Sequence, residues 1–335
     1  MRAGQCGTTT APDRERGVAL MSAPGSTWTL ERTWAARDLS VDQLAARKAH
    51  LGASVSVVLP ALNEVATIEG VVDACTVLAD RLIDELVVID GGSEDGTAER
   101  AAAAGARVHV DAQILPEFGP ALGKGDALWR ALAVTSGDIV VYIDTDIRNP
   151  DPRFVYGLLA PLLEDPTIQL VKAFYERPVE VGKILHPTGG GRVTELLARP
   201  LLNLFWPELA TLVQPLSGEY AGRRELLEAL PFFTGYGVEL GMLVDTLIRV
   251  GSQAIGQVDV DERIHRNQSL ESLSRMAFGI AQVAMRRLAD DGRLSPGVEF
   301  PNTYLQFTRS ASGISSSLRA VEIVQRPPMN SVATR

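Results

Sequence analysis

The chain has 335 residues, of which 46% are hydrophobic and 22% charged, so it is long and apolar enough to bury a sizeable core. Its 32 basic and 41 acidic residues give a formal net charge of −9. This balance excludes a general nucleic-acid-binding protein, because no surplus of lysine and arginine can neutralise phosphates. The two cysteines, Cys6 and Cys75, are too few for a disulfide framework and favour a reducing compartment.

The first 26 residues are rich in glycine, serine, threonine and proline and contain no apolar stretch of signal-peptide length. They predict a disordered arm and a cytoplasmic protein. No segment reaches the roughly 18 apolar residues that a membrane span requires, so no membrane partner is expected. We expect an N-terminal arm (1–50), two halves of one compact body (51–150 and 151–295) and a loosely structured tail (296–335).

The first half alternates between buried strands and helices. Cys75 lies on the apolar face of the first helix, which predicts a packed core thiol. Alternation at these lengths is typical of βαβ units, so the sequence predicts an α/β fold with a mostly parallel, Rossmann-like sheet flanked by helices. The predicted strands are Ser54–Pro60, Glu85–Asp90, Ala106–Val110 and Asp138–Asp144, and the helices are Glu64–Asp80, an alanine-rich helix after Thr97, and Gly125–Thr135.

The second half is less regular and mainly helical. Apolar spacing predicts a helix over Arg192–Phe205, with Val193, Leu196, Leu197, Leu201 and Leu204 on one side. Further helices are predicted over Tyr236–Val250 and Ser269–Asp290, and strands over Ile168–Tyr175 and Ala254–Val260.

Three predicted strands end in polar residues: Pro60–Glu64, Asp90–Ser93 and Asp144–Asp146. Ligands of open parallel sheets bind beyond the carboxyl ends of the strands, so these residues should share one edge. Two carboxylates one residue apart repel each other, and a hard cation such as Mg²⁺ or Mn²⁺ would relieve that repulsion. The alternative is a solvated turn, since the same composition is common in turns.

No G-x-G-x-x-G follows the first strand and no phosphate-binding P-loop occurs, which disfavours a dehydrogenase and a P-loop enzyme. Lys124 stands between two glycines just before a helix. It could approach a phosphate or a uracil-like edge there, or lie free in solvent as most lysines do.

Three consecutive glycines lie within His186–Glu195 and precede a helix. Their N–H groups, with Arg192 and Thr194, could hold a phosphate or carboxylate, although glycine runs are often only hinges. Glu239, at the start of the next helix, could accept hydrogen bonds from sugar hydroxyls or simply cap that helix. His265 lies among cations that keep it neutral, so it could ligate a metal or lie on the surface.

These blocks, in this order, resemble glycosyltransferases of the GT-A fold. The downstream stretches T-G-G-G-R-V-T-E, Q-P-L-S-G-E-Y-A, G-Y-G-V-E and H-R-N are more specific. They resemble the glucosyl-3-phosphoglycerate and mannosyl-3-phosphoglycerate synthases over roughly residues 54–290. The resemblance implies a retaining, divalent-metal-dependent transfer of glucose or mannose from UDP-glucose or GDP-mannose to D-3-phosphoglycerate, by a homodimer, with a helical acceptor-binding half.

The same resemblance implies roles for single residues. Asp146 and His265 would bind the metal, and Glu239 and Asp146 would be the catalytic residues. The nucleotide sugar would contact Pro60, Leu62, Glu64, Gly92, Lys124, Asp144, Thr145, Gly218 and Glu239. The acceptor would contact Gly191, Arg192, Thr194, Tyr236, Arg263 and Asn267.

Two other functions remain open from the sequence. A sugar-1-phosphate nucleotidyltransferase also needs a nucleotide, Mg²⁺ and an α/β sheet, but usually carries a glycine-rich loop after the first strand. The second is a non-enzymatic, nucleotide-binding regulatory module. Product formation separates both from a hexosyltransferase.

Overall fold

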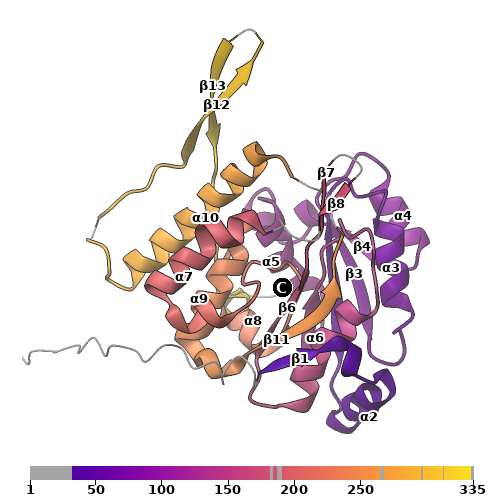
Figure 1. Ribbon diagram of the computed structural model, residues 1–335. Coiled ribbons are helices and arrows are strands. Elements are labelled where there is room, and N and C mark those ends of the chain that lie inside the picture. The colour runs from indigo at the N-terminus through magenta and orange to yellow at the C-terminus, as the bar shows by residue number, and fades with distance from the viewer. Residues whose placement is uncertain are drawn as a thin grey trace, which may run out of the picture.

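The computed structural model describes residues 32–181, 184–186, 191–264, 268–295, 297–311 and 313–332. Its centre is an eight-stranded sheet with the strand order β1-β11-β6-β9-β5-β2-β3-β4. Helices cover both faces of the sheet, and a two-stranded hairpin, β12–β13, projects away from the body (Figure 1).

The strands of the central sheet are β1 (Thr33–Ala35), β2 (Val55–Ala61), β3 (Glu85–Asp90), β4 (Arg107–Val110), β5 (Ile139–Tyr142), β6 (Leu170–Glu176), β9 (Tyr220–Arg223) and β11 (Ile255–Glu262). The main helices are α2 (Val41–Leu51), α3 (Ile68–Thr76), α4 (Thr97–Ala103), α5 (Lys124–Val134), α6 (Arg153–Glu164), α7 (Arg199–Phe205), α8 (Arg224–Ala229), α9 (Val238–Val250) and α10 (Leu270–Asp290). The short strands are β7 (Val179–Val181), β8 (Ile184–His186), β10 (Phe232–Phe233), β12 (Thr303–Ser310), β13 (Gly313–Ala320) and β14 (Gln325–Arg326).

The predicted α/β architecture with a mostly parallel sheet is confirmed. β2 pairs in parallel with β3 and β5, and β11 pairs in parallel with β6 and β1. Only β9 runs against its neighbours β5 and β6. The predicted strands are apolar on both faces because a parallel sheet covered by helices is buried on both sides.

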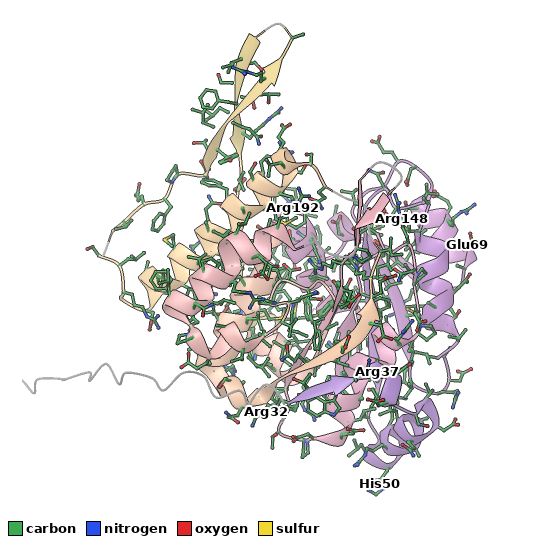
Figure 2. All side chains as sticks on the ribbon, viewed as in Figure 1. Arg32, Arg37, His50, Glu69, Arg148 and Arg192 are labelled. Atoms are coloured by element: carbon green, nitrogen blue, oxygen red, sulfur yellow. The ribbon has the colours of Figure 1, made fainter. Side chains whose placement is uncertain are left out.

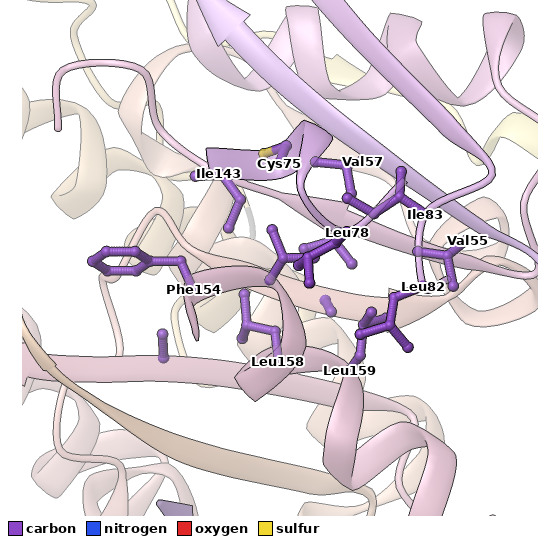
Figure 3. Packing of buried hydrophobic residues seen from close by; sticks show 14 of the residues in the cluster. Val55, Val57, Cys75, Leu78, Leu82, Ile83, Ile143, Phe154, Leu158 and Leu159 are labelled. Carbon is purple, nitrogen blue, oxygen red and sulfur yellow. The ribbon is translucent and has the colours of Figure 1, made fainter. Parts of the chain in front are cut away.

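Each face of the sheet supports its own apolar core. Val55, Val57 and Leu59 of β2 point to the face covered by α3 and α6, and Val58 points to the opposite face, covered by α5 and α9. In the first core, side chains of α3 and α6 meet those of β2 (Figure 3). Cys75 lies in this core, 2% exposed, and burial raises the pKa of its thiol to about 12, as expected for a packed core thiol.

The sequence did not predict structure before residue 51, but two elements form there. β1 adds to the edge of the sheet beside β11, and α2 packs against α6. Leu44 is the buried residue of α2. Part of the predicted arm is therefore integral to the sheet.

The predicted helix over Arg192–Phe205 is not a single α-helix. Thr194–Ala198 form a π-helical turn, closed by the N–H of Arg199 donating to the carbonyl of Thr194. Pro200 follows directly and has no N–H to continue an α-helical ladder, which accounts for the wider turn. Leu196 and Leu204 are 79% and 72% exposed, so the prediction of one common apolar side is wrong for these two leucines.

The tail after residue 296 is more ordered than predicted. Arg326 of β14 is buried and pairs with Asp126 of α5, with Nη2–Oδ2 and Nε–Oδ1 distances of 2.7 and 2.9 Å. Trp129 of the same helix donates to the carbonyl of Pro327 at 2.8 Å. Local composition gives no indication of this long-range ion pair. Within the described ranges, no helix combines the length and apolarity needed to cross a membrane.

Candidate active site

The carboxyl ends of β2, β3 and β5 meet at one edge of the sheet, as predicted. Ala61 is in register with Asp90, and the hydroxyl of Thr145 donates to the carbonyl of Pro60 at 2.8 Å. The Thr145 side chain is therefore engaged with β2.

The turns after β2 and β3 are tied to each other. The Asp90 carboxylate accepts the N–H groups of Gly92 and Ser93, both at 3.0 Å, and the Ser93 hydroxyl accepts the N–H of Asn63 at 2.9 Å. Gly92 has a φ of +83°, which favours glycine. Leu62 is 56% exposed beside these turns. Four residues predicted to contact the nucleotide thus lie together: Pro60, Leu62, Glu64 and Gly92.

Lys124, at the start of α5, joins two acidic residues from distant parts of the chain. Its Nζ lies 2.6 Å from Oδ1 of Asp144 and 2.9 Å from Oε1 of Glu239. The Lys124 side chain is only 17% exposed, so it is not a solvated loop lysine. Glu239, in the first turn of α9, is buried and paired with this ammonium group, so it does more than cap its helix.

Burial and charge act in opposite directions on these groups. Burial alone would raise the pKa of Asp144, but the attraction of Lys124 and Arg263 outweighs it and lowers that pKa to about 2. Burial disfavours a charged lysine, yet Asp144 and Glu239 together raise the pKa of Lys124 well above its usual range. Lys124 and Asp144 are therefore both charged at neutral pH.

Gly218, the residue after Ser217, lies directly against the Lys124–Asp144 ion pair and leaves no room for a side chain. A Cβ on Gly218 would overlap the carboxylate of Asp144 and reach within 2.5 Å of the Lys124 ammonium group. The backbone at Gly218 therefore forms one wall of the site directly against this ion pair. Glycine, predicted to contact the nucleotide sugar, is required here for space.

The predicted metal pair, Asp144 and Asp146, faces Arg263, which follows the end of β11. One nitrogen of Arg263, Nη2, lies 3.2 Å from Oδ2 of Asp144 and 2.6 Å from Oδ1 of Asp146. Its Nε lies 2.9 Å from Oε1 of Glu219. The sequence placed Arg263 with the acceptor, whereas here its guanidinium group is directed at the aspartates.

The two aspartates suit a hard cation. They supply oxygen ligands, and their proximity requires positive charge between them. Burial raises the pKa of Asp146, and Arg263 only partly offsets that effect. Among the residues with a described placement, no group of three or more His, Cys, Asp or Glu side chains could hold a metal. His265, the other predicted metal ligand, lies outside the described residues.

The predicted acceptor residues Gly191, Arg192 and Thr194 lie at the start of the π-helical turn. Arg192 donates to the carbonyl of Gln268 at 2.9 Å, just before α10 (Figure 2). Gly191 has a φ of +75°, and a Cβ there would lie 3.9 Å from the Arg177 guanidinium group. Most of the predicted glycine cradle, and Asn267, lie outside the described residues. Tyr236 is 48% exposed in the turn before α9.

Sequence reasoning placed the Ser217-Gly218-Glu219 turn beside the hexose, but it missed three buried or half-buried residues of the site: Lys172, Tyr175 and Arg177. All three lie in β6 or directly after it. The rule that ligands bind beyond strand ends, applied to this strand too, would have found Tyr175 and Arg177. Lys172 carries no local signal, because its burial depends on the pairing of β6 with β9.

The amino-acid sequence matches the model of the family described as "Glycosyl transferase family 2" over residues 56–231, just over half of the chain. The curated glucosyl-3-phosphoglycerate synthase of Mycobacterium tuberculosis is 48% identical over 322 residues, covering 93% of this chain and 95% of that protein. This chain belongs to the family of glucosyl- and mannosyl-3-phosphoglycerate synthases, within glycosyl transferase family 2.

Solved structures of related proteins lead to the same family assignment. Mannosyl-3-phosphoglycerate synthase from Rubrobacter xylanophilus is 44% identical, with a TM-score of 0.84 over 92% of this chain and 97% of that one. The M. tuberculosis glucosyl-3-phosphoglycerate synthase, crystallised with Mn²⁺, UDP-glucose and phosphoglyceric acid, is 49% identical, with a TM-score of 0.75 over 87% of this chain and 95% of that one. The predicted family, GT-A fold and enzyme class are confirmed, which disfavours the nucleotidyltransferase and the regulatory module.

Proposed function

We propose that this protein transfers glucose from UDP-glucose to D-3-phosphoglycerate with retention of anomeric configuration, using Mg²⁺ or Mn²⁺. The observation that carries the proposal is the meeting of Asp144, Asp146, Lys124 and Glu239 at the sheet edge where the family's nucleotide-sugar site is expected. The relative crystallised with Mn²⁺, UDP-glucose and phosphoglyceric acid supports this choice of ligands.

The donor half of the site would hold the nucleotide sugar between the turns after β2 and β3 and the Lys124 ion pair. Asp146, with His265, would hold the divalent cation. A cation bound there neutralises charge on the departing diphosphate. Lys124 adds a fixed positive charge nearby, which is already desolvated and oriented before the substrate binds. Glu239, held by Lys124, would accept hydrogen bonds from the transferred hexose.

The acceptor half would bind the phosphate and carboxylate of 3-phosphoglycerate. Arg192 and the N–H groups around Gly191 and Thr194 offer donors for these anions, with Tyr236 and Asn267 as further contacts. Arg177 adds a guanidinium group near Gly191. Fixing both anionic groups would direct the acceptor hydroxyl at the anomeric carbon. These residues would therefore contribute to the rate by orienting the acceptor and would not take part in bond making or breaking.

A second candidate is mannosyl transfer from GDP-mannose to the same acceptor. It is favoured by the TM-score of 0.84 with the mannosyl-3-phosphoglycerate synthase, against 0.75 with the glucosyl enzyme. The deciding experiment incubates the purified protein with each donor and each of several phosphorylated three-carbon acids. NMR couplings of the product then report the anomeric configuration. Transfer of no hexose from either donor, with Mg²⁺ or Mn²⁺ present, would overturn the proposed function.

We also propose that the enzyme acts as a homodimer in the cytoplasm. One face of the β12–β13 hairpin carries Leu305, Phe307, Ile314 and Leu318, which are 53–67% exposed, with Leu305 opposite Leu318. A two-stranded hairpin is marginal in water, so a second copy would stabilise it by covering this face. Light scattering of the wild-type protein and of Phe307→Ser tests the dimer, and a monomeric wild-type protein contradicts it.

A further inference from the structure

Arg263 takes the position between two carboxylates where positive charge is required. Its Nη2 is within 3.2 Å of both Asp144 and Asp146, and its side chain is only 5% exposed. Two aspartates this close cannot both stay ionised in a partly buried site without a nearby cation. Lys124 already pairs with Asp144, and in the absence of metal Arg263 supplies the positive charge at Asp146.

The same contact obstructs a metal ion. Oδ1 of Asp146 accepts from Arg263 at 2.6 Å, so a cation that uses this oxygen has to compete with the guanidinium group. A displaced arginine that stayed in the protein interior without a carboxylate partner would be strongly disfavoured. Metal binding therefore depends on where Arg263 finds its countercharge after leaving Asp146.

Glu219 provides that countercharge from the opposite side. Its carboxylate is fully buried and lies 2.9 Å from Nε of Arg263. The other Glu219 oxygen accepts the hydroxyl of Tyr175 at 2.5 Å and that of Ser217 at 3.1 Å. These bonds fix Glu219 independently of the two aspartates. Arg263 can consequently release Asp146 while its Nε stays within ion-pairing distance of Glu219, a contact that relies on charge because it lacks hydrogen-bond geometry.

We propose that Arg263 is an internal counter-ion that exchanges with the divalent metal on the aspartate pair, and that Glu219 is the positioning residue that retains Arg263 during the exchange. The proposal rests on the metal role of Asp146 given above. It implies that metal affinity is limited by the strength of the Arg263–Asp146 contact. It also implies that the effects of Arg263 and Glu219 on metal affinity depend on each other.

The test is a Mn²⁺ titration of the full-length protein without nucleotide, followed by the EPR signal of free Mn²⁺. Arg263→Met removes the competitor, so Mn²⁺ affinity should rise at least tenfold. Glu219→Gln leaves a displaced Arg263 without a partner, so affinity should fall at least threefold. In the double variant Arg263→Met/Glu219→Gln, the second change should have less than a twofold effect, because no arginine remains to be retained.

The double variant separates exchange from a general electrostatic field, because a field alone predicts that the two effects add. Arg177→Met is the matched control. It removes an equal charge that acts on Asp144 without an ion pair to either aspartate, and it should change Mn²⁺ affinity less than threefold. Additive effects in the double variant, or an Arg177→Met effect as large as that of Arg263→Met, overturn the exchange.

Two further variants keep the outcome decisive. Asp146→Asn should abolish Mn²⁺ binding; unchanged binding would refute the metal role of Asp146 and, with it, this proposal. Suppose that Asp146→Asn loses Mn²⁺ binding but the effects of the Arg263 and Glu219 variants are additive. The metal role of Asp146 then stands, and only the exchange is refuted. If Arg263→Met does not fold, as thermal melting reports, the same cycle is run with Arg263→Lys, which keeps the charge but shortens the reach to Asp146. Additive effects of the two substitutions in that cycle would also contradict the exchange.

Discussion

Lys124 and Glu239 form an ion pair with an Nζ–Oε1 distance of 2.9 Å, which ties the first turn of α5 to the first turn of α9. The two residues are 115 positions apart in the sequence, on two helices that cover the same face of the sheet. Through Asp144, the same ammonium group also reaches the end of β5. One lysine thus couples the donor side of the site to the residue expected to hold the hexose.

Replacing Lys124 by methionine should lower kcat/KM for the nucleotide sugar by roughly 100-fold, since removing one fixed, desolvated charge donor typically costs that much. Steady-state kinetics with varied donor and saturating 3-phosphoglycerate measure this effect. Lys124→Arg keeps the charge and is the control, with a smaller loss expected. Equal losses in both variants would indicate that shape, rather than charge, is what the site needs at this position.

Asp144 should make stability depend on pH in the acid range. Its pKa falls from 3.8 to about 2 on folding, so its ionised form adds about 2 kcal/mol of stability above pH 4. That contribution is lost as the pH falls from about 4 to 2. Metal-free protein should therefore lose stability over this range more steeply than Asp144→Asn, as measured by denaturant unfolding. Parallel pH profiles for the two proteins would contradict the predicted ion pairing.

Gly218→Ala should impair donor binding while the fold remains. The new Cβ would overlap the Asp144 carboxylate and push the Lys124 ion pair apart, so the KM for the nucleotide sugar should rise at least tenfold. Gly279→Ala is the matched control, because this glycine lies inside α10 and its added Cβ would meet only flexible side chains, Cδ1 of Ile323 at 3.3 Å and Cγ1 of Val321 at 3.6 Å. A donor KM that changes equally in both variants would disprove the specific contact.

Arg326→Met should reduce the free energy of unfolding by about 3 kcal/mol, because it leaves the buried Asp126 without its bidentate partner. Arg130, at 3.4 Å, compensates Asp126 only partly. Urea denaturation measures the change, and Arg309→Met on the exposed hairpin is the control, expected within about 0.5 kcal/mol of wild type. Unchanged stability of Arg326→Met would contradict a stabilising role for the Arg326–Asp126 ion pair.

The core of the fold could be predicted because its signals are local. β2 and β3 are apolar runs closed by polar turns, and the structure places them within a residue of the predicted bounds. The predicted helix over Ser269–Asp290 begins where Ser269 caps it, with its hydroxyl accepting the N–H of Ser272 at 3.1 Å. The errors fall where local composition is a poor guide, at the π-helical turn before Pro200 and in the tail that holds Arg326.

The sequence by itself determined the chemistry available to this protein: which strands end in carboxylates, which glycines precede helices and which lysine stands between glycines. Each of these depends on near neighbours in the chain. The tertiary structure decided which charges meet. Arg263 lies 117 residues from Asp146 and 44 from Glu219, and only the pairing of β11, β6, β9 and β5 brings the three together. Ion pairs across a sheet depend on strand order, and no local pattern encodes that order.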